Sequence, residues 1–175
     1  MFNIFKSFLL IIFLFFVLIS KSYSETLKIS FVDMDKIIAV STAGKKVQKS
    51  INSLIKKEEE KFKKKEADLK KKEEEILKQK NIISKDELDK KIKEFQKDLS
   101  DFRNERAKFN RSINKKNLEA TNKMVNAINK ILTQYAADNS LSLVIQKKNI
   151  IIGKSELDIT DEILKEFNNQ VKSIN

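Results

Sequence analysis

The spacing of apolar and polar positions divides the chain into segments of different period. Residues 27–32 alternate apolar with polar side chains and are rich in β-branched and aromatic types, which predicts a strand. The pattern is helical from about residue 45 to residue 138, and the apolar run at 141–145 predicts a second strand. Residues 150–152 predict a third strand, joined to the second as a β-hairpin through a turn at 147–149. Both ends of the chain therefore supply strands, and the middle supplies helix.

The helical middle carries one narrow apolar stripe. Between Lys56 and Lys80, 19 of 25 residues are charged, yet one apolar residue recurs every seven positions. The recurring residues are Ile55, Phe62, Leu69, Ile76 and Ile83. Such a stripe is typical of a long, solvent-exposed helix with a thin contact surface for one neighbour.

A second long helix is expected after a break at residues 81–84. Ser84 to Glu87 fits the S-x-x-E capping box, in which the serine hydroxyl accepts a hydrogen bond from the N3 amide. The apolar stripe that follows is denser and consists of Leu88, Ile92, Phe95, Leu99, Phe102, Phe109 and Ile113. The two helices are predicted to pair as an antiparallel hairpin arm, roughly 38 residues out and roughly 54 back, or about 55–80 Å long.

The first 24 residues have the features of a secretory signal peptide. Lys6 supplies a basic start, and the twelve apolar residues from Phe8 to Ile19 are too few for a membrane-spanning helix. Ser22 and Ser24 are small residues at the −3 and −1 positions of a cut before Glu25. We therefore expect export and cleavage between Ser24 and Glu25, the alternative being an uncleaved N-terminal anchor.

Composition excludes most catalytic chemistry. The 175 residues include no proline, cysteine, histidine or tryptophan and only two glycines. A thiol nucleophile, a histidine acid or base, a disulfide and a Cys/His zinc site are therefore impossible. No catalytic, cofactor or metal site is predicted, and the protein is not expected to be an enzyme. The acidic runs Glu58–Glu60 and Glu73–Glu75 are interpreted as solvated helix faces rather than cation sites.

The parts outside the arm make only a small body. Residues 25–44 hold the first strand, and residues 139–175 hold the β-hairpin and a short C-terminal helix from Asp161 to about Val171, with Thr160 as its N-cap. About sixty residues with three short strands form a marginal core. Oligomerisation is the expected remedy, because strands from several subunits can build one shared sheet or barrel.

The order of these segments resembles the Skp/OmpH family of periplasmic chaperones for outer-membrane proteins. The resemblance covers essentially all of the mature chain. It is carried by the entry strand Lys28–Met34 and by Asp158–Thr160 within Leu157–Leu164, with Leu141–Ile145 in the matching order between them. It implies an α+β, mainly α protein in which a small β body is shared by three subunits and three helical arms enclose a cavity, as in a jellyfish. The implied activity is that of an ATP-independent holdase for unfolded outer-membrane proteins, without cofactors.

Client contact in this reading is diffuse over residues 45–138 rather than assigned to single residues. Phe95, Phe102 and Phe109 lie seven apart and are expected to pack within the arm in preference to contacting clients. Arg106 stands where the next apolar residue was due, either as a hydrated interruption or as a point of flexibility. A lipopolysaccharide site on basic arm residues has been proposed in the family, and no residue here is assigned to it.

Charge leaves two questions open. The net charge is +11, or +9 once the two lysines of the leader are removed. This charge fits attraction to acidic clients and to anionic lipid or lipopolysaccharide. A genome biased toward lysine would explain it equally well. Nucleic acid is not an expected partner, because an exported protein is separated from it.

The alternative function is a secreted coiled-coil spacer or adaptor that binds a folded envelope partner. This alternative gives no reason for the strands at both ends of the chain.

Overall fold

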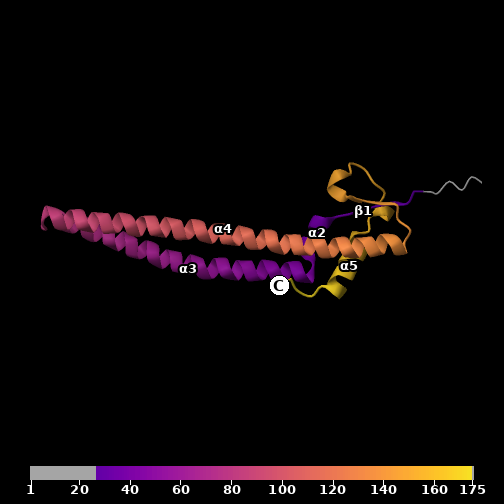
Figure 1. The fold of residues 1–175 in the computed structure, drawn as a ribbon, viewed down its shortest axis with the longest axis horizontal. Coiled ribbons are helices and arrows are strands. Elements are labelled where there is room, and N and C mark those ends of the chain that lie inside the picture. The colour runs from indigo at the N-terminus through magenta and orange to yellow at the C-terminus, as the bar shows by residue number, and fades with distance from the viewer. Residues whose placement is uncertain (1–26, 175) are drawn as a thin grey trace, which may run out of the picture.

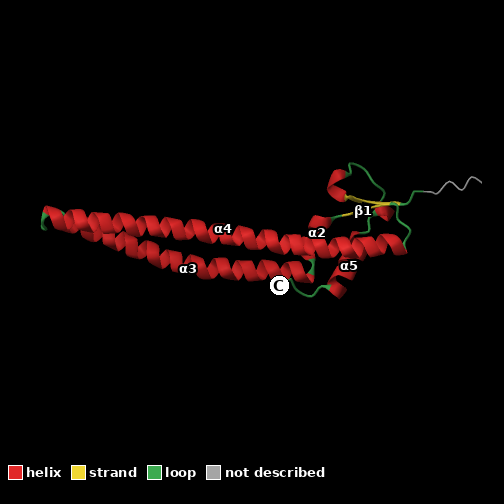
Figure 2. Ribbon diagram, in the orientation of Figure 1, coloured by secondary structure: helices red, strands yellow, loops and turns green. Residues whose placement is uncertain are grey.

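The computed structural model describes residues 27–174, and the predicted signal peptide lies outside them. The elements in chain order are β1 (Ile29–Val32), α2 (Met34–Val40), α3 (Thr42–Gln79), α4 (Lys85–Asp138), β2 (Leu143–Gln146) and α5 (Thr160–Gln170). Two short 3₁₀ turns, Lys147–Asn149 and Ser155–Leu157, lie between β2 and α5. The described part is mainly helical with a two-stranded sheet, which agrees with the predicted class (Figure 2).

Two long helices dominate the shape of the molecule. α3 has 38 residues and α4 has 54, and they lie side by side and extend away from the remaining elements (Figure 1). The turn between them contains the expected cap, because the backbone N–H of Glu87 donates to the Ser84 hydroxyl at 3.3 Å. We call the paired α3 and α4 the arm, its 80–84 turn the tip, and the opposite end of the molecule the body.

The arm begins three residues earlier than the sequence pattern indicated. The Ser41 side chain caps α3 by accepting from the backbone N–H of Gly44 at 3.1 Å, so the helix starts at Thr42 and not near Lys45. Gly44 also permits the close passage of α2, since a Cβ there would lie 1.8 Å from the carbonyl oxygen of Ile38. The absence of a side chain at this position is therefore a condition of the corner between α2 and α3.

The sheet differs from the predicted one. β2 pairs in parallel with β1, with Ile29 opposite Leu143 and Val32 opposite Gln146, and the predicted β-hairpin over 141–152 is wrong for the described chain. Residues 147–149 form a 3₁₀ turn, and residues 150–152 follow it outside any strand. Parallel strands need a long connection between them, and the whole arm provides it. The return of the arm therefore brings β1 and β2 together, although the two strands lie far apart in the sequence.

The body core takes side chains from both ends of the chain and from the root of the arm, which is the end of the arm that joins the body. Its buried members are Val32, Met34, Ile37, Ala43, Met124, Ile128, Ile131, Ile159, Ile163 and Phe167. Three of these belong to the last turns of α4, a region that sequence analysis placed wholly in the arm. α4 therefore joins the arm rigidly to the body, because the same helix is packed in both.

Candidate functional site

The two arm helices meet along the apolar stripes that the sequence contains. Every member of the α3 stripe from Ile55 to Ile83 is half-buried. In the α4 stripe from Leu88 to Ile113, Phe102 and Ile113 are buried and the other members are half-buried. A pair of helices can shield such a seam from two sides only, so the arm keeps a thin apolar line open to solvent between its charged faces.

Phe62 of α3 is the centre of an aromatic cluster within this seam. Its ring centroid lies 5.9 Å from that of Phe102 and 5.8 Å from that of Phe109, both in edge-to-face geometry. The prediction that phenylalanines of α4 pack inside the arm is confirmed for these two. Phe95, one heptad nearer the tip, is half-buried.

Arg106 has a role that neither of its two sequence interpretations contained. Its guanidinium carbon lies 5.9 Å from the centroid of the Phe62 ring and 5.7 Å from that of Phe102. This is cation–π geometry, so the arginine joins the rings of both helices while its own side chain stays exposed. At the interruption of the apolar stripe, the guanidinium group of Arg106 therefore contacts both aromatic rings.

Lysines of α3 also reach across to acidic residues of α4. Lys65 pairs with Glu105, and Lys72 pairs with Asp98. The hydrogen bond to the Asp98 carboxylate raises the pKa of Lys72. Both pairs are exposed, so each adds little stability, but together they favour one register of the two helices.

Apolar side chains also stand out from the arm away from the seam. Leu77 and Leu118 are each 62% exposed, Ile82 at the tip is 81% exposed, and Leu54 is 40% exposed. These positions are distributed from the tip to the root and are separated by charged surface. The arm therefore offers several separate apolar contacts and no single binding centre among its described residues.

The body exposes apolar surface more strongly. Ile151 and Ile152, in the loop after β2, are 98% and 92% exposed. Leu27, Ile29 and Leu143, at the start of the two-stranded sheet, are also exposed. Adjacent isoleucines that are almost fully exposed are uncommon on the surface of a monomeric protein.

A network of hydrogen bonds around Asp158 connects separate segments of the body. The Asp158 Oδ1 accepts from the backbone N–H of Thr160 at 3.0 Å, and the Thr160 hydroxyl both donates to Asp158 and accepts from the backbone N–H of Asp33 at 2.8 Å. Lys147 Nζ lies 2.7 Å from Asp158 Oδ2. Burial alone raises the pKa of Asp158, but the hydrogen bonds from Lys147 and Thr160 outweigh it and hold the pKa below the ordinary value.

The network corrects one prediction about the C-terminal helix. Thr160 is the first residue of α5 and not its N-cap, and Ile159 at the cap position makes no side-chain cap bond. The threonine hydroxyl is used instead to tie the start of α5 to the end of β1, a contact over 127 positions of sequence. This long-range use of the Asp-Ile-Thr stretch was not visible in the local pattern.

Within residues 27–174, no three acidic side chains converge on a point that could hold a metal ion. No helix in the same range has both the length and the apolar character that a membrane crossing needs.

Comparison with known proteins gives a consistent family. The family described as outer membrane protein (OmpH-like) matches residues 28–167. A solved structure of a candidate outer membrane chaperone (OmpH-like) from Caulobacter crescentus CB15 is similar in fold, with a TM-score of 0.78 and 13% sequence identity over 86% of this chain and 89% of the other. No curated protein matches the chain. Because the family match spans most of the sequence, from the first strand into the last helix, the chain belongs to the OmpH-like family, as its segment order indicated.

Proposed function

We propose that this protein is an ATP-independent holdase chaperone that encloses unfolded outer-membrane proteins in a cavity between the arms of a homotrimer. The observation that carries the proposal is the combination of a long arm bearing scattered exposed apolar side chains with a small body whose isoleucines are uncovered. Membership in the OmpH-like family and the fold shared with a candidate outer membrane chaperone support the same activity.

Assembly follows from the incomplete body. The single chain forms a sheet of only two described strands and leaves Ile151 and Ile152 in solvent. A second and a third copy would cover these side chains and extend the sheet, which removes both an apolar patch and open strand edges. The number three comes from the family resemblance, and the uncovered surface gives the physical reason for association.

Holding follows from the distribution of contacts on the arm. An unfolded barrel protein exposes alternating apolar side chains and unpaired backbone, so it aggregates readily. Apolar points such as Leu77, Ile82 and Leu118 can each bind it weakly, and many weak contacts in one enclosure retain a chain without fixing its structure. The lysine-rich surface adds attraction for acidic clients, and for anionic lipid or lipopolysaccharide at the membrane.

The proposed compartment is the periplasm. The leader over residues 1–24 would direct export and be removed between Ser24 and Glu25. Intact-mass measurement of the exported protein checks the cut, and a retained leader would contradict it.

The activity is tested with purified mature protein and an unfolded outer-membrane barrel protein diluted from urea. Light scattering should stay low without any nucleotide when the chaperone is present in excess, and adding ATP should change nothing. Aggregation at the rate of the client alone would contradict the proposal and favour the spacer or adaptor.

A further inference from the structure

Acidic residues are nearly absent from the part of the arm that adjoins the body. The cross-helix ion pairs set the register in which residues 42–57 of α3 lie beside residues 113–130 of α4, and we call these two stretches the basic segment. The basic segment contains nine lysines and one acidic residue, Glu119. The rest of the arm, residues 58–112, contains 18 basic and 15 acidic residues. The positive charge of the arm is therefore concentrated next to the body.

A genome biased toward lysine does not account for this difference. Basic residues occupy 9 of 34 positions in the basic segment and 18 of 55 positions in the rest of the arm, which are similar fractions. The two parts differ in their acidic residues, and the basic segment carries amides instead, with six of the nine asparagines of residues 42–130. Asparagine is a poorer helix former than glutamate. Its repeated use at exposed helix positions therefore indicates a role other than helix stability.

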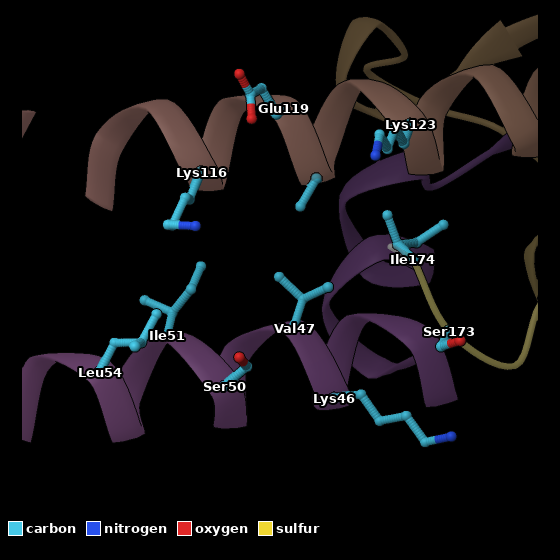
Figure 3. Close-up of a pocket in the computed structure, with 11 residues that line it drawn as sticks. Lys46, Val47, Ser50, Ile51, Leu54, Lys116, Glu119, Lys123, Ser173 and Ile174 are labelled. Carbon is cyan, nitrogen blue, oxygen red and sulfur yellow. The ribbon is translucent and has the colours of Figure 1, made fainter. Parts of the chain in front are cut away.

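On α3, the basic segment forms a groove on the exposed surface. Val47 and Ile51 point toward α4, whereas Lys46 points away from it (Figure 3). A shallow groove of about 430 Å³, which we call the α3 groove, has a lining of lysines and uncharged polar residues only. Its lining residues are Lys45, Gln48, Lys49, Asn52, Ser53 and Lys56. All six are exposed to solvent.

The lysines of the α3 groove suit a chain that carries carboxylates at alternate positions. Among the described residues, Lys45, Lys49 and Lys56 form no ion pair, so their ammonium groups are available to a ligand. Lys45 and Lys49 are four residues apart, which is about 6 Å along the helix axis. Every second side chain of an extended peptide is about 6.6 Å from the last. Two alternate carboxylates of such a peptide can therefore reach both lysines.

The amides of the α3 groove favour a peptide over a phosphate surface. Gln48 and Asn52 lie between the lysines, and Gln48 Nε2 donates to Asn52 Oδ1 at 2.8 Å. A side-chain amide has two N–H donors and an oxygen acceptor, so each of these residues keeps further groups for hydrogen bonding. They can both donate to and accept from the unpaired backbone of an extended peptide. A phosphate group at neutral pH offers acceptors alone, so it would use only half of this capacity.

Building on the proposed holdase function, we infer that the α3 groove binds extended acidic segments of unfolded clients. The carboxylates of the segment pair with Lys45, Lys49 and Lys56, and its backbone bonds to the two amides. Barrel strands alternate apolar with polar side chains, so a strand whose polar positions are acidic fits the groove best. The client is then held in one direction, with acidic strands next to the body and apolar stretches against exposed side chains such as Leu77 nearer the tip.

The test compares two triple variants of the full mature protein that have the same net charge. Glutamine replaces lysine in both, because it removes the charge and keeps a similar helix propensity. The groove variant carries Lys45→Gln, Lys49→Gln and Lys56→Gln. The control variant changes three exposed lysines of the same helix nearer the tip and carries Lys63→Gln, Lys64→Gln and Lys71→Gln.

The probe is a fluorescein-labelled, end-blocked peptide that alternates valine with aspartate. At low ionic strength the groove variant should bind it about threefold or more weakly than wild-type, and the control variant should change its affinity little. The same peptide with asparagine in place of aspartate should bind weakly and equally to all three proteins. Equal losses in the two variants would overturn the inference, because net charge alone would then explain the binding. An unchanged peptide affinity in a groove variant that no longer binds phosphatidylglycerol vesicles would also overturn it and assign the groove to lipid.

A second measurement needs no variant. A photoactivatable form of the aspartate peptide should crosslink to wild-type protein mainly within residues 42–57, and crosslinks mainly within residues 58–112 would overturn the inference. If wild-type protein suppresses aggregation of the barrel client but these peptide results fail, only this inference falls. Failure of wild-type protein in the aggregation assay removes the holdase proposal itself.

Discussion

Replacing Ile151 by aspartate should break the assembly of the body. Burying one isoleucine side chain is worth about 1.5–3 kcal/mol, so in the proposed trimer Ile151 and Ile152 of the three chains would contribute about 9–18 kcal/mol before the entropy of association is subtracted. The substitution at Ile151 removes half of that sum and places three carboxylates in the interface. A loss of even about 4.5 kcal/mol weakens association more than about a thousandfold.

Sedimentation velocity over a range of protein concentrations measures the effect. Wild-type protein should remain a trimer, Ile151→Asp should sediment as monomer, and Ile151→Ala should give an intermediate, concentration-dependent mixture. Ile82→Asp is the matched control, because it puts the same charge on an isoleucine that is 81% exposed at the tip, far from the body, and should leave the trimer intact. A trimer that survives Ile151→Asp, or that both substitutions disrupt equally, would refute the assignment of this loop to the interface.

Three further predictions concern the arm, the corner and the body. Phe62→Ala should cost about 2–4 kcal/mol, because it removes a partly buried ring with two edge-to-face partners, and faster hydrogen exchange should be confined to the middle of the arm; unchanged exchange would contradict this. Gly44→Ala should destabilise the fold by more than about 2 kcal/mol in urea titrations, since the new Cβ would meet the carbonyl of Ile38, and a neutral result would mean that the corner between α2 and α3 is looser than described. Asp158 has a lowered pKa in the folded protein, so its stabilising effect is complete above about pH 4 and is lost as the pH falls through the folded pKa; the stability gap between wild-type and Asp158→Asn should narrow over that range, and a constant gap would contradict the network.

Local features of the sequence predicted the two arm helices well. Ser84 with its capping box and the heptad spacing of Phe62 and its neighbours depend on residues within a few positions, and the ends of α3 at the tip and of α4 at Asp138 agree with expectation. The predictions that failed concern features that depend on residues far away in the sequence. The parallel pairing of β1 with β2 needs the return of the arm, and the role of Arg106 needs the ring of Phe62, which is 44 positions away.

The candidate binding surfaces likewise include one feature that could be predicted from the sequence and one that could not. A diffuse distribution of contacts over residues 45–138 could be expected from the lack of any chemical motif, and the exposed positions such as Leu77 are consistent with it. The exposure of Ile151 could not be foreseen, because an apolar triplet next to a predicted turn is equally typical of a paired strand. Only the observed path of the loop separates the two.

In the proposed holdase, the depth of the space between the arms determines which clients are held. Removing residues 66–79 and 85–98 takes two heptads from each helix, joins the natural turn to the remaining arm in phase, and shortens it by about 21 Å. Full-length Leu77→Gln is the control for loss of an exposed apolar contact without loss of depth.

The deciding measurement is light scattering by a small and a large unfolded barrel client at matched trimer concentration. The shortened protein should remain trimeric, protect the small client almost as well as wild-type and largely fail to protect the large one. Undiminished protection of the large client by the shortened protein would contradict the enclosed cavity.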